Sequence, residues 1–229
     1  MVDRHDTPQS GPGPGAVAGG ADMAGAAPRL PREGTDNLFW HHGQVSQEAR
    51  ARHFGYLPST IWLTGLSGAG KSTVAYALEQ VLHAHAWPSF VLDGDNLRHH
   101  LNSDLGFSAA DRTENIRRTA EVARLMNDAG LTVISAFISP SLSDRAMACA
   151  LIGGPRFIEV HVCTAAAVCE ARDSKGLYAK ARAGQISDFT GVSAPYEAPL
   201  APALSLDLGQ LCVTAAADAL YQHLLRRGA

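Results

Sequence analysis

The feature that most restricts the fold of this chain is a glycine-rich segment at residues 65–72, Gly-Leu-Ser-Gly-Ala-Gly-Lys-Ser, which fits the pattern G-x-x-x-x-G-K-[ST]. A short run of β-branched and apolar residues at 59–64 precedes it and predicts a buried strand. Apolar residues at helical spacing follow over 71–86 and predict a helix. Between a strand and a helix, the glycines allow backbone N–H groups to curl around phosphate oxygens, and the helix N-terminus adds a positive dipole end. The segment therefore predicts a phosphate-binding loop, or P-loop, for a nucleoside triphosphate.

The polar residues of the P-loop have expected tasks. Lys71 supplies a positive charge for the β- and γ-phosphates and is a predicted catalytic residue, and the Ser72 hydroxyl is placed to ligate Mg²⁺. The residues of this segment that are predicted to bind ATP are Gly65, Leu66, Ser67, Gly68, Ala69, Gly70, Lys71, Ser72 and Thr73. The motif leaves the reaction open, because GTPases, motor ATPases and small-molecule kinases all contain it.

The remainder of the chain alternates between strand-like and helix-like patterns. Further strands are predicted at 89–92, 131–137, 157–162 and 204–208, and further helices at 109–129, 142–151, 165–172 and 213–225. Ser108 is the expected N-cap of the longest helix, and Gly130 is its expected stop. The alternation predicts an α/β, three-layer P-loop NTPase or kinase fold, with a five-stranded, mostly parallel sheet and helices on both faces. In such sheets ligands bind beyond the carboxyl ends of the strands.

The length and composition indicate how the chain is divided. The 229 residues, 46% of them hydrophobic, are enough for one α/β domain and an appendage. Residues 1–35 are rich in Gly, Ala and Pro and are expected to form a disordered tail, because they cannot bury enough apolar surface to offset chain entropy. Residues 36–58 contain aromatics and predict an ordered leader. The kinase domain is expected at 59–229, with a lid loop at about 173–202, where periodicity is weak.

Charge and composition also restrict the partners of the chain. The formal net charge of −3 argues against a dedicated nucleic-acid-binding protein. The sequence has no apolar run near the roughly 18 residues that a membrane span requires, so no membrane is expected. The four cysteines have neither Cys-x-x-Cys nor zinc-ligand spacing, and they are interpreted as reduced thiols of a cytoplasmic protein.

Two carboxylates, Asp93 and Asp95, follow the second predicted strand at the ligand edge of the sheet. There they can bind Mg²⁺ through water and orient an acceptor hydroxyl, which favours a small-molecule kinase and makes both of them predicted catalytic residues. A solvated turn with Asp93 as a helix cap is the alternative.

Arginines gather around the entrance of the long helix, with Asn115 among them: Arg98, Arg112, Arg117 and Arg118. Because guanidinium groups form forked hydrogen bonds with anions, this density favours an anionic substrate. For Arg117 and Arg118, a solvated helix face is an equally good interpretation.

Several further blocks resemble the adenylyl-sulfate kinases in order and spacing, over nearly everything from residue 37 to the C-terminus. The blocks are 61–73, 92–98, 104–108, 111–118, 137–140, 169–172, 175–178, 189–191 and 195–199. The resemblance implies transfer of the ATP γ-phosphate to the ribose 3′-hydroxyl of adenosine 5′-phosphosulfate (APS), giving ADP and 3′-phosphoadenosine 5′-phosphosulfate, the activated sulfate donor. It also implies a homodimer, and an association with an ATP sulfurylase, which some members carry as a fused domain.

The resemblance further implies roles for individual residues. Asp95 would orient or deprotonate the acceptor hydroxyl, and Arg172 would lie against the ATP base. The implied APS-binding residues are Arg98, Arg112 and Asn115 for the phosphosulfate, Phe107 and Phe189 for the adenine, and Ile138 and Ser139 through backbone contacts. Lys175 and Leu177 would belong to a lid that closes over both nucleotides.

The chain departs from the family pattern after Ile138-Ser139-Pro140. Members usually continue with an aromatic residue and an arginine, whereas this chain has Ser141 and Leu142, with Arg145 three positions further on. Cys163 and Ser174 replace an aspartate and a proline. The core set is intact, which favours an active enzyme over a nucleotide-sensing module without turnover, and the block at 111–118 disfavours a kinase for another acceptor. That set is Lys71, Ser72, Asp93, Asp95, Arg98 and Asn115.

Overall fold

The computed structural model describes residues 39, 41 and 43–228, and within them the chain forms one five-stranded sheet. All neighbouring strands are parallel, in the order β2-β3-β1-β4-β5. The strands are β1 (Thr60–Thr64), β2 (Ser89–Asp93), β3 (Thr132–Ala136), β4 (Phe157–Val162) and β5 (Leu204–Leu206). The predicted α/β class is confirmed, as are all five strands, and the sheet is wholly rather than mostly parallel.

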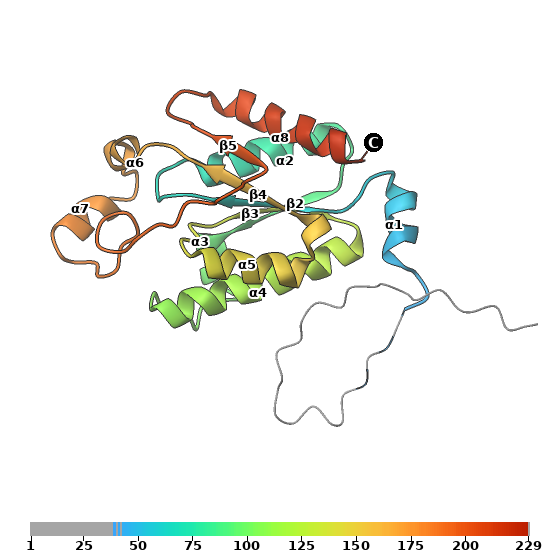
Figure 1. The fold of residues 1–229 in the computed structure, drawn as a ribbon, viewed down its shortest axis with the longest axis horizontal. Coiled ribbons are helices and arrows are strands. Elements are labelled where there is room, and N and C mark those ends of the chain that lie inside the picture. The colour runs from blue at the N-terminus through green and yellow to red at the C-terminus, as the bar shows by residue number, and fades with distance from the viewer. Residues whose placement is uncertain (1–38, 40, 42, 229) are drawn as a thin grey trace, which may run out of the picture.

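Helices cover both faces of the sheet (Figure 1). They are α1 (Gln47–Phe54), α2 (Lys71–Ala84), α3 (Gly94–Arg98), α4 (Ala109–Ala129), α5 (Leu142–Ile152), α6 (Ala166–Arg172), α7 (Leu177–Arg182) and α8 (Val213–Gly228), with a 3₁₀ turn η1 (Gly154–Arg156). Helices α2 and α8 pack on one face, and α4 and α5 on the other. The expected ends of α4 are confirmed, because Ser108 Oγ accepts a hydrogen bond from Asp111 N and Gly130 has a φ of 105°.

Strand β1 supplies the centre of two hydrophobic clusters, because its side chains alternate between the faces of the sheet. Ile61 and Leu63 are buried with the residues of α2 and α8, whereas Trp62 is buried with those of α4 and α5. All five residues of β1 are buried. The middle strand is thus fixed on both sides, and so is the position at which its carboxyl end meets the P-loop.

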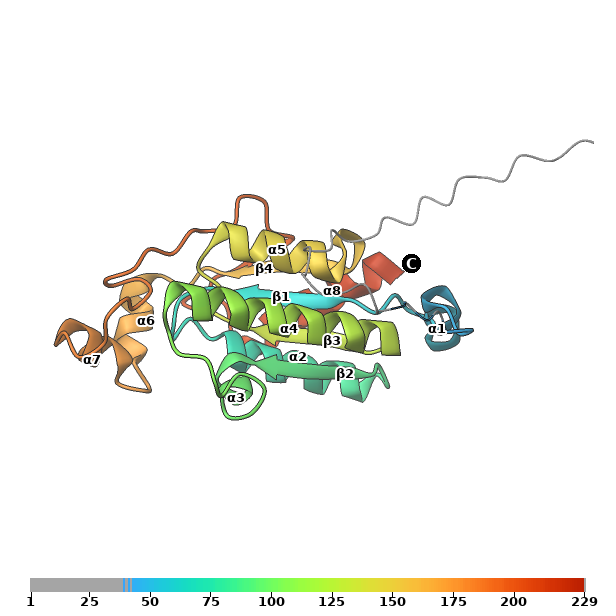
Figure 2. The ribbon, with the colours of Figure 1, turned by 90° about the horizontal axis from the view of Figure 1, so that it is seen from below.

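The predicted lid loop is not wholly irregular. It contains the short helix α7, whose first turn is held by Asp173: Oδ1 of this carboxylate accepts from Tyr178 N and Oδ2 from Ala179 N, each at 3.0 Å. Burial of one side of this helix outweighs its weak periodicity, because Tyr178 and Ala181 are both buried. Helices α6 and α7 lie together at the end of the molecule opposite α1 (Figures 1 and 2).

The leader expected at 36–58 is described from residue 43 onward and at positions 39 and 41, while the tail expected at 1–35 lies outside the described residues. Helix α1 is followed by Tyr56, whose hydroxyl donates to Gly130 O at 2.7 Å and whose ring lies 4.5 Å from that of Trp87. These contacts join the leader to the start of β2 and of β3. Within the described part of the chain, no helix is long and apolar enough to cross a membrane.

Candidate active site

The P-loop connects β1 to α2 at the carboxyl end of the sheet. Gly65 has a φ of 154°, and a Cβ at this position would lie 2.4 Å from Val162 O. Gly68 has a φ of 74°, and a Cβ there would lie 2.8 Å from Cys169 O. Because both neighbours are backbone atoms that cannot move away, no side chain fits at either glycine. The motif therefore needs glycine at these two positions, because the P-loop backbone lies too close to neighbouring backbone for any side chain.

Lys71 begins α2, and its side chain folds back over the P-loop. Its Nζ donates to Gly65 O at 3.0 Å and to Leu66 O at 2.7 Å, and the residue is 8% exposed. Burial lowers the pKa of Lys71 to about 8, although Cys169, Asp93 and Asp95 act in the opposite direction. The ammonium is thus held among carbonyl oxygens in a site with little water, where a phosphate would replace them as the stronger partner.

Asp93 connects the end of β2 to the P-loop. Its Oδ2 accepts a 2.6 Å hydrogen bond from Ser72 Oγ, and its Oδ1 accepts from Asp95 N at 3.0 Å. Asp93 is therefore the N-cap of α3, as one interpretation of the sequence held. The same side chain also contacts the P-loop hydroxyl, while its catalytic role stays a prediction. Helix α3 itself was not predicted.

The oxygens of Ser72 and Asp93 suit Mg²⁺, which prefers oxygen ligands and usually takes only one or two from the protein when phosphates supply others. A group of three or more His, Cys, Asp or Glu side chains able to hold a metal does not occur among the residues that the structure describes. The donor set therefore fits a metal shared with a nucleotide rather than a closed protein cage.

Asp95, the second residue of α3, forms an ion pair with Lys175 from the segment before α7. Both side chains are largely exposed, at 66% for Asp95 and 59% for Lys175. The pair joins the edge of β2 to the expected lid, so the two residues that the sequence separates by 80 positions meet above the P-loop. Leu177, at the start of α7, packs partly buried against the core.

Two arginines hold the segment that carries Phe107. Arg98 Nη1 donates to Gly106 O at 2.8 Å, and its guanidinium carbon lies 4.2 Å from the Phe107 ring centroid. Arg112 Nε donates to Phe107 O at 2.9 Å, and its Nη2 donates to Asp188 O at 2.5 Å. Burial and the charge of Arg112 both lower the pKa of Arg98. Phe107 itself is 67% exposed, so its ring is free to stack on a ligand.

Phe189, the other aromatic residue expected at an adenine, lies one residue beyond Asp188 and is buried. It packs edge-on against Tyr178 of α7, at 5.0 Å between ring centroids, and the Tyr178 hydroxyl donates to Ser67 O at 3.0 Å. Burial raises the pKa of Tyr178 to about 12. Arg112 thus connects the segments of Phe107 and Phe189, but one ring is exposed and the other is packed within the lid.

The segment after β3 brings Ile138 and Ser139 to the P-loop. Ile138 O accepts from Gly65 N at 3.4 Å, and Ser139 has a φ of 36°, which is unusual for a residue with a side chain. Ser139 Oγ accepts from Trp62 Nε1 at 3.2 Å, and its carbonyl accepts from Arg145 Nη1 at 2.7 Å. This segment is therefore held in a constrained backbone conformation beside the P-loop.

Arg145 is a site-forming residue whose role the sequence did not reveal. It is 2% exposed, and besides Ser139 O it binds Glu159 Oε1 on β4 and Glu197 O, each at 2.7 Å. These partners lie 14 and 52 positions away, so no local pattern predicts them. Where the family usually has an arginine, Leu142 offers its backbone N–H to Glu197 Oε2 at 2.6 Å.

The remaining expected residues divide into two groups. Arg172 donates to Gly68 O at 3.3 Å and to Leu208 O at 2.6 Å, so it lies at the P-loop. Arg117 and Arg118 instead bind Glu114, and these bonds lower the pKa of that carboxyl to about 2. These ion pairs favour the interpretation of the two arginines as a solvated helix face over a role at the substrate. Asn115 is buried at the same helix entrance.

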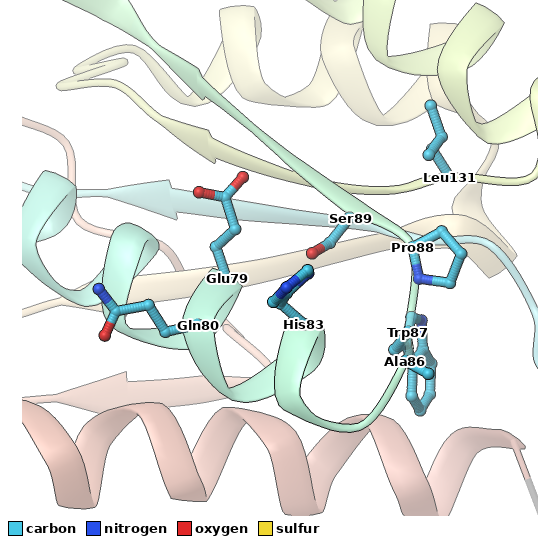
Figure 3. Close-up of a pocket in the computed structure, with 8 residues that line it drawn as sticks. All are labelled: Glu79, Gln80, His83, Ala86, Trp87, Pro88, Ser89 and Leu131. Carbon is cyan, nitrogen blue, oxygen red and sulfur yellow. The ribbon is translucent and has the colours of Figure 1, made fainter.

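A pocket at the opposite end of the sheet contains none of the predicted site residues (Figure 3). It lies between α2 and the start of β2 and is lined by Glu79, Gln80, His83, Ala86, Trp87, Pro88, Ser89 and Leu131. The chemistry of the site belongs instead to the open carboxyl edge, where the P-loop, α3 and the lid segments meet.

The similarities to known proteins agree with this site. The model of the adenylylsulphate kinase family matches residues 57–207. An adenylyl-sulfate kinase of Shewanella sp. (strain ANA-3) is 53% identical over 192 residues, which cover 84% of this chain and 94% of the relative, and one from Shewanella oneidensis is 54% identical over 188 residues, which cover 82% and 92%. The solved structure of an APS kinase from Mycobacterium tuberculosis in complex with AMPPNP and APS is 46% identical, with a TM-score of 0.72, over 74% of this chain and 99% of that one. The resemblance seen in the sequence is confirmed, and the chain belongs to the adenylyl-sulfate kinase family.

Proposed function

We propose that this chain transfers the γ-phosphate of ATP to the 3′-hydroxyl of APS, giving ADP and 3′-phosphoadenosine 5′-phosphosulfate. The observation that carries the proposal is the meeting of Lys71, the Ser72–Asp93 hydrogen bond and Asp95 at one edge of the sheet. Phosphoryl transfer needs positioning and charge stabilisation more than covalent chemistry, and these groups supply both. The M. tuberculosis relative, whose structure holds AMPPNP and APS, supports the choice of nucleotides.

ATP would bind through the backbone N–H groups of residues 65–73 and the start of α2. Lys71 would exchange its two carbonyl partners for phosphate oxygens, and Arg172 would lie against the base of ATP beside Gly68. Ser72 would ligate Mg²⁺ directly and Asp93 through water. When bound, Mg²⁺ neutralises charge on the β- and γ-phosphates.

Asp95 would accept the proton of the 3′-hydroxyl as the acceptor oxygen attacks phosphorus. To do so it must leave its ion pair with Lys175, and both side chains are exposed enough to move without breaking the core. The released ammonium would then be available for the phosphates. In this account, Lys175 pairs with the Asp95 carboxylate in the free enzyme and stabilises the charge of the phosphates when nucleotides are bound. Leu177 holds the lid against the core.

The acceptor, APS, would lie on the side of α3 opposite to the ATP bound at the P-loop. Arg98, Arg112 and Asn115 would bind its phosphosulfate, and Phe107 would stack on its adenine opposite Phe189. Ile138 and Ser139 would contact it through the backbone. Both arginines now bind backbone oxygens, which are weaker partners than an anion, and this supports an exchange of partners on binding.

We also propose that the enzyme acts as a homodimer in the cytoplasm and in association with an ATP sulfurylase. The four cysteines are all unpaired, which supports a reducing compartment. A hexameric APS kinase from Thiobacillus denitrificans, 30% identical with a TM-score of 0.58 over 79% of this chain and 32% of that one, supports self-association. Sedimentation analysis, alone and with a sulfurylase, tests both associations.

The proposed reaction is tested by measuring ADP release from Mg·ATP with APS, shikimate, gluconate or a nucleoside as acceptor. We expect ADP release when APS is the acceptor and none with the other three acceptors. A thermal shift with APS but no ADP would indicate a nucleotide-sensing module and would overturn the proposal. Turnover with another acceptor in preference to APS would indicate a different small-molecule kinase.

A further inference from the structure

Two buried amides form a hydrogen bond between the loop that precedes α4 and the second turn of α4. Asn102, in the loop between α3 and α4, is 0% exposed, and its Nδ2 donates a 2.8 Å hydrogen bond to Oδ1 of Asn115 on α4. Asn115 is 5% exposed. Neither the P-loop nor the lid touches this pair through a hydrogen bond recorded for the described residues, so its purpose lies elsewhere.

The position of Asn102 is fixed independently of Asn115. Its backbone N–H donates to Leu97 O at 2.9 Å, which closes the turn after α3. The loop is also held to α4 by Arg118, which binds Leu101 O at 3.2 Å and Asp104 Oδ1 at 2.7 Å. The Asn102 side chain is therefore held in place, and the Asn115 amide adopts the orientation in which its Oδ1 accepts from Asn102 Nδ2.

The direction of the hydrogen bond decides what Asn115 presents to the site. An asparagine side chain has one acceptor oxygen and one donor nitrogen. Because Oδ1 of Asn115 accepts from Asn102, its Nδ2 must point the other way. Within the described residues that nitrogen has no hydrogen-bond partner, and it is not among the fully buried unpartnered atoms, so it retains some exposed surface.

The reverse orientation is less favourable. It would bury Nδ2 of Asn102 without an acceptor, whereas in the observed orientation the one fully buried atom of this pair that lacks a partner is Oδ1 of Asn102. A buried carbonyl oxygen without a partner is tolerated more often than a buried N–H group. Asn102 therefore holds the Asn115 amide in a single orientation.

We propose that Asn102 is a positioning residue for the acceptor: by binding Asn115 Oδ1, it makes Asn115 a pure hydrogen-bond donor toward the phosphosulfate of APS. This inference rests on the proposed function. An anion needs donors, and a reversed amide would present an oxygen that repels it. Asn102 thus contributes to the preference for an anionic acceptor without touching it.

The test is a double-mutant cycle on Asn102 and Asn115, with the KM for APS, the KM for ATP and the Kd of APS from calorimetry as readouts. We expect Asn102→Ala and Asn115→Ala each to raise the KM and Kd for APS about tenfold, as the loss of one hydrogen bond to a charged group does, and to leave the KM for ATP unchanged. In the Asn115→Ala background, Asn102→Ala should raise them no further. If Asn102→Ala raised the KM and Kd for APS by the same factor in the wild-type and the Asn115→Ala proteins, the inference would be overturned.

A second variant keeps the test decisive if Asn102→Ala folds poorly. Asn102→Asp keeps the volume but can only accept, so it turns the Asn115 amide around, and it should raise the Kd of APS more than Asn102→Ala does. An equal or smaller rise would contradict the inference. The matched control is Asn127→Ala at the far end of α4, whose buried amide binds Ser59 O and Leu131 O. It should lower Tm and leave the KM for APS unchanged.

The result separates this inference from the proposed function. Wild-type turnover of APS with no effect of Asn115→Ala would overturn the positioning role and leave the reaction standing. Wild-type protein that neither binds nor phosphorylates APS would overturn both.

Discussion

Ser72 Oγ donates a 2.6 Å hydrogen bond to Asp93 Oδ2, and this contact joins the first turn of α2 to the end of β2 across 21 positions of sequence. The same carboxylate caps α3 through Asp95 N. The buried side chain of Asp93 therefore sets the distance between the Ser72 hydroxyl and Asp95, the carboxylate that is expected at the acceptor. A change at Asp93 should consequently affect metal use and acceptor geometry together.

The first prediction concerns Asp93→Asn. Asparagine caps helices about as well as aspartate, so Tm should change little, but the lost charge should raise the Mg²⁺ concentration needed for half-maximal rate. A Mg²⁺ titration of turnover at fixed ATP measures this. The control is Asp218→Asn on the exposed side of α8, which should leave the titration unchanged. An unaltered Mg²⁺ requirement in Asp93→Asn would contradict the metal assignment.

The second prediction concerns Lys71→Ala. The loss of its ammonium should lower kcat at least about 10²-fold, because the charge that develops on the phosphates loses a preorganised partner. The far-UV spectrum and Tm should be retained, since the variant removes a buried charge rather than a packed apolar group. Near-normal turnover would remove the P-loop from the mechanism.

The third prediction concerns pH. In the free enzyme the pKa of Lys71 is about 8, lowered mainly by burial from 10.5, so kcat/KM for ATP should fall above about pH 8. Bound phosphates raise the pKa of the ammonium, so kcat should stay level to higher pH. Parallel profiles of kcat and kcat/KM would contradict this account.

The lowered pKa of Lys71 also has a consequence for stability. Between about pH 8 and 10.5 the folded state binds fewer protons at Lys71 than the unfolded chain, so this group's contribution to the free energy of unfolding rises with pH. Wild type should therefore gain stability relative to Lys71→Met across that range. A constant difference between the two denaturation curves would indicate an ordinary, solvated lysine.

The fourth prediction concerns Asp95→Asn. If this carboxylate accepts the proton of the acceptor hydroxyl, kcat should fall about 10²-fold or more while the KM for ATP is unchanged. Lys175→Met breaks the same ion pair but keeps the carboxylate, so its kcat should fall less. Equal losses in the two variants would mean that the pair, rather than the base, matters.

The fifth prediction concerns Arg145→Met. Its removal leaves Glu159 without its partner and frees the carbonyls of Ser139 and Glu197, which should cost about 3 kcal/mol and lower Tm by about 10 °C. Arg182→Met, which breaks the exposed pair with Glu170, is the control and should shift Tm little. Comparable shifts would show that burial of Arg145 is energetically unimportant.

Leu142 extends this prediction to the residue where the chain departs from its family. Because Arg145 and Glu197 already hold the segment after Ser139, Leu142→Arg should leave the KM for APS unchanged. A lower KM in this variant would show that the chain has lost a substrate contact at this position.

The sequence predicted the elements whose cause is local. Strand β1 is recognisable by its β-branched run and α4 by Ser108 and Gly130, because each of these patterns has its cause within a few residues. The P-loop is recognisable by its glycines, although the backbone atoms that exclude a side chain there belong to the distant Val162 and Cys169. The carboxyl-edge position of Asp93 followed from the parallel topology.

The parts that escaped prediction depend on distant partners. Helix α7 is too short for a periodic signal, and its one local indication is Asp173, whose carboxylate accepts from Tyr178 N and Ala179 N in the first turn. The role of Arg145 depends on β4 and on the end of the lid, and that of Asn102 on one amide of α4. Tertiary contacts of this kind cannot be derived from spacing in one sequence.

The central claim is tested most directly by following the label from [γ-³²P]ATP with APS as acceptor. The account predicts that label appears on the ribose 3′-oxygen of APS in proportion to ADP, and that Lys71→Ala forms both products at least about 10²-fold more slowly. Label released as inorganic phosphate, or no labelled nucleotide under saturating Mg·ATP and APS, would contradict the account.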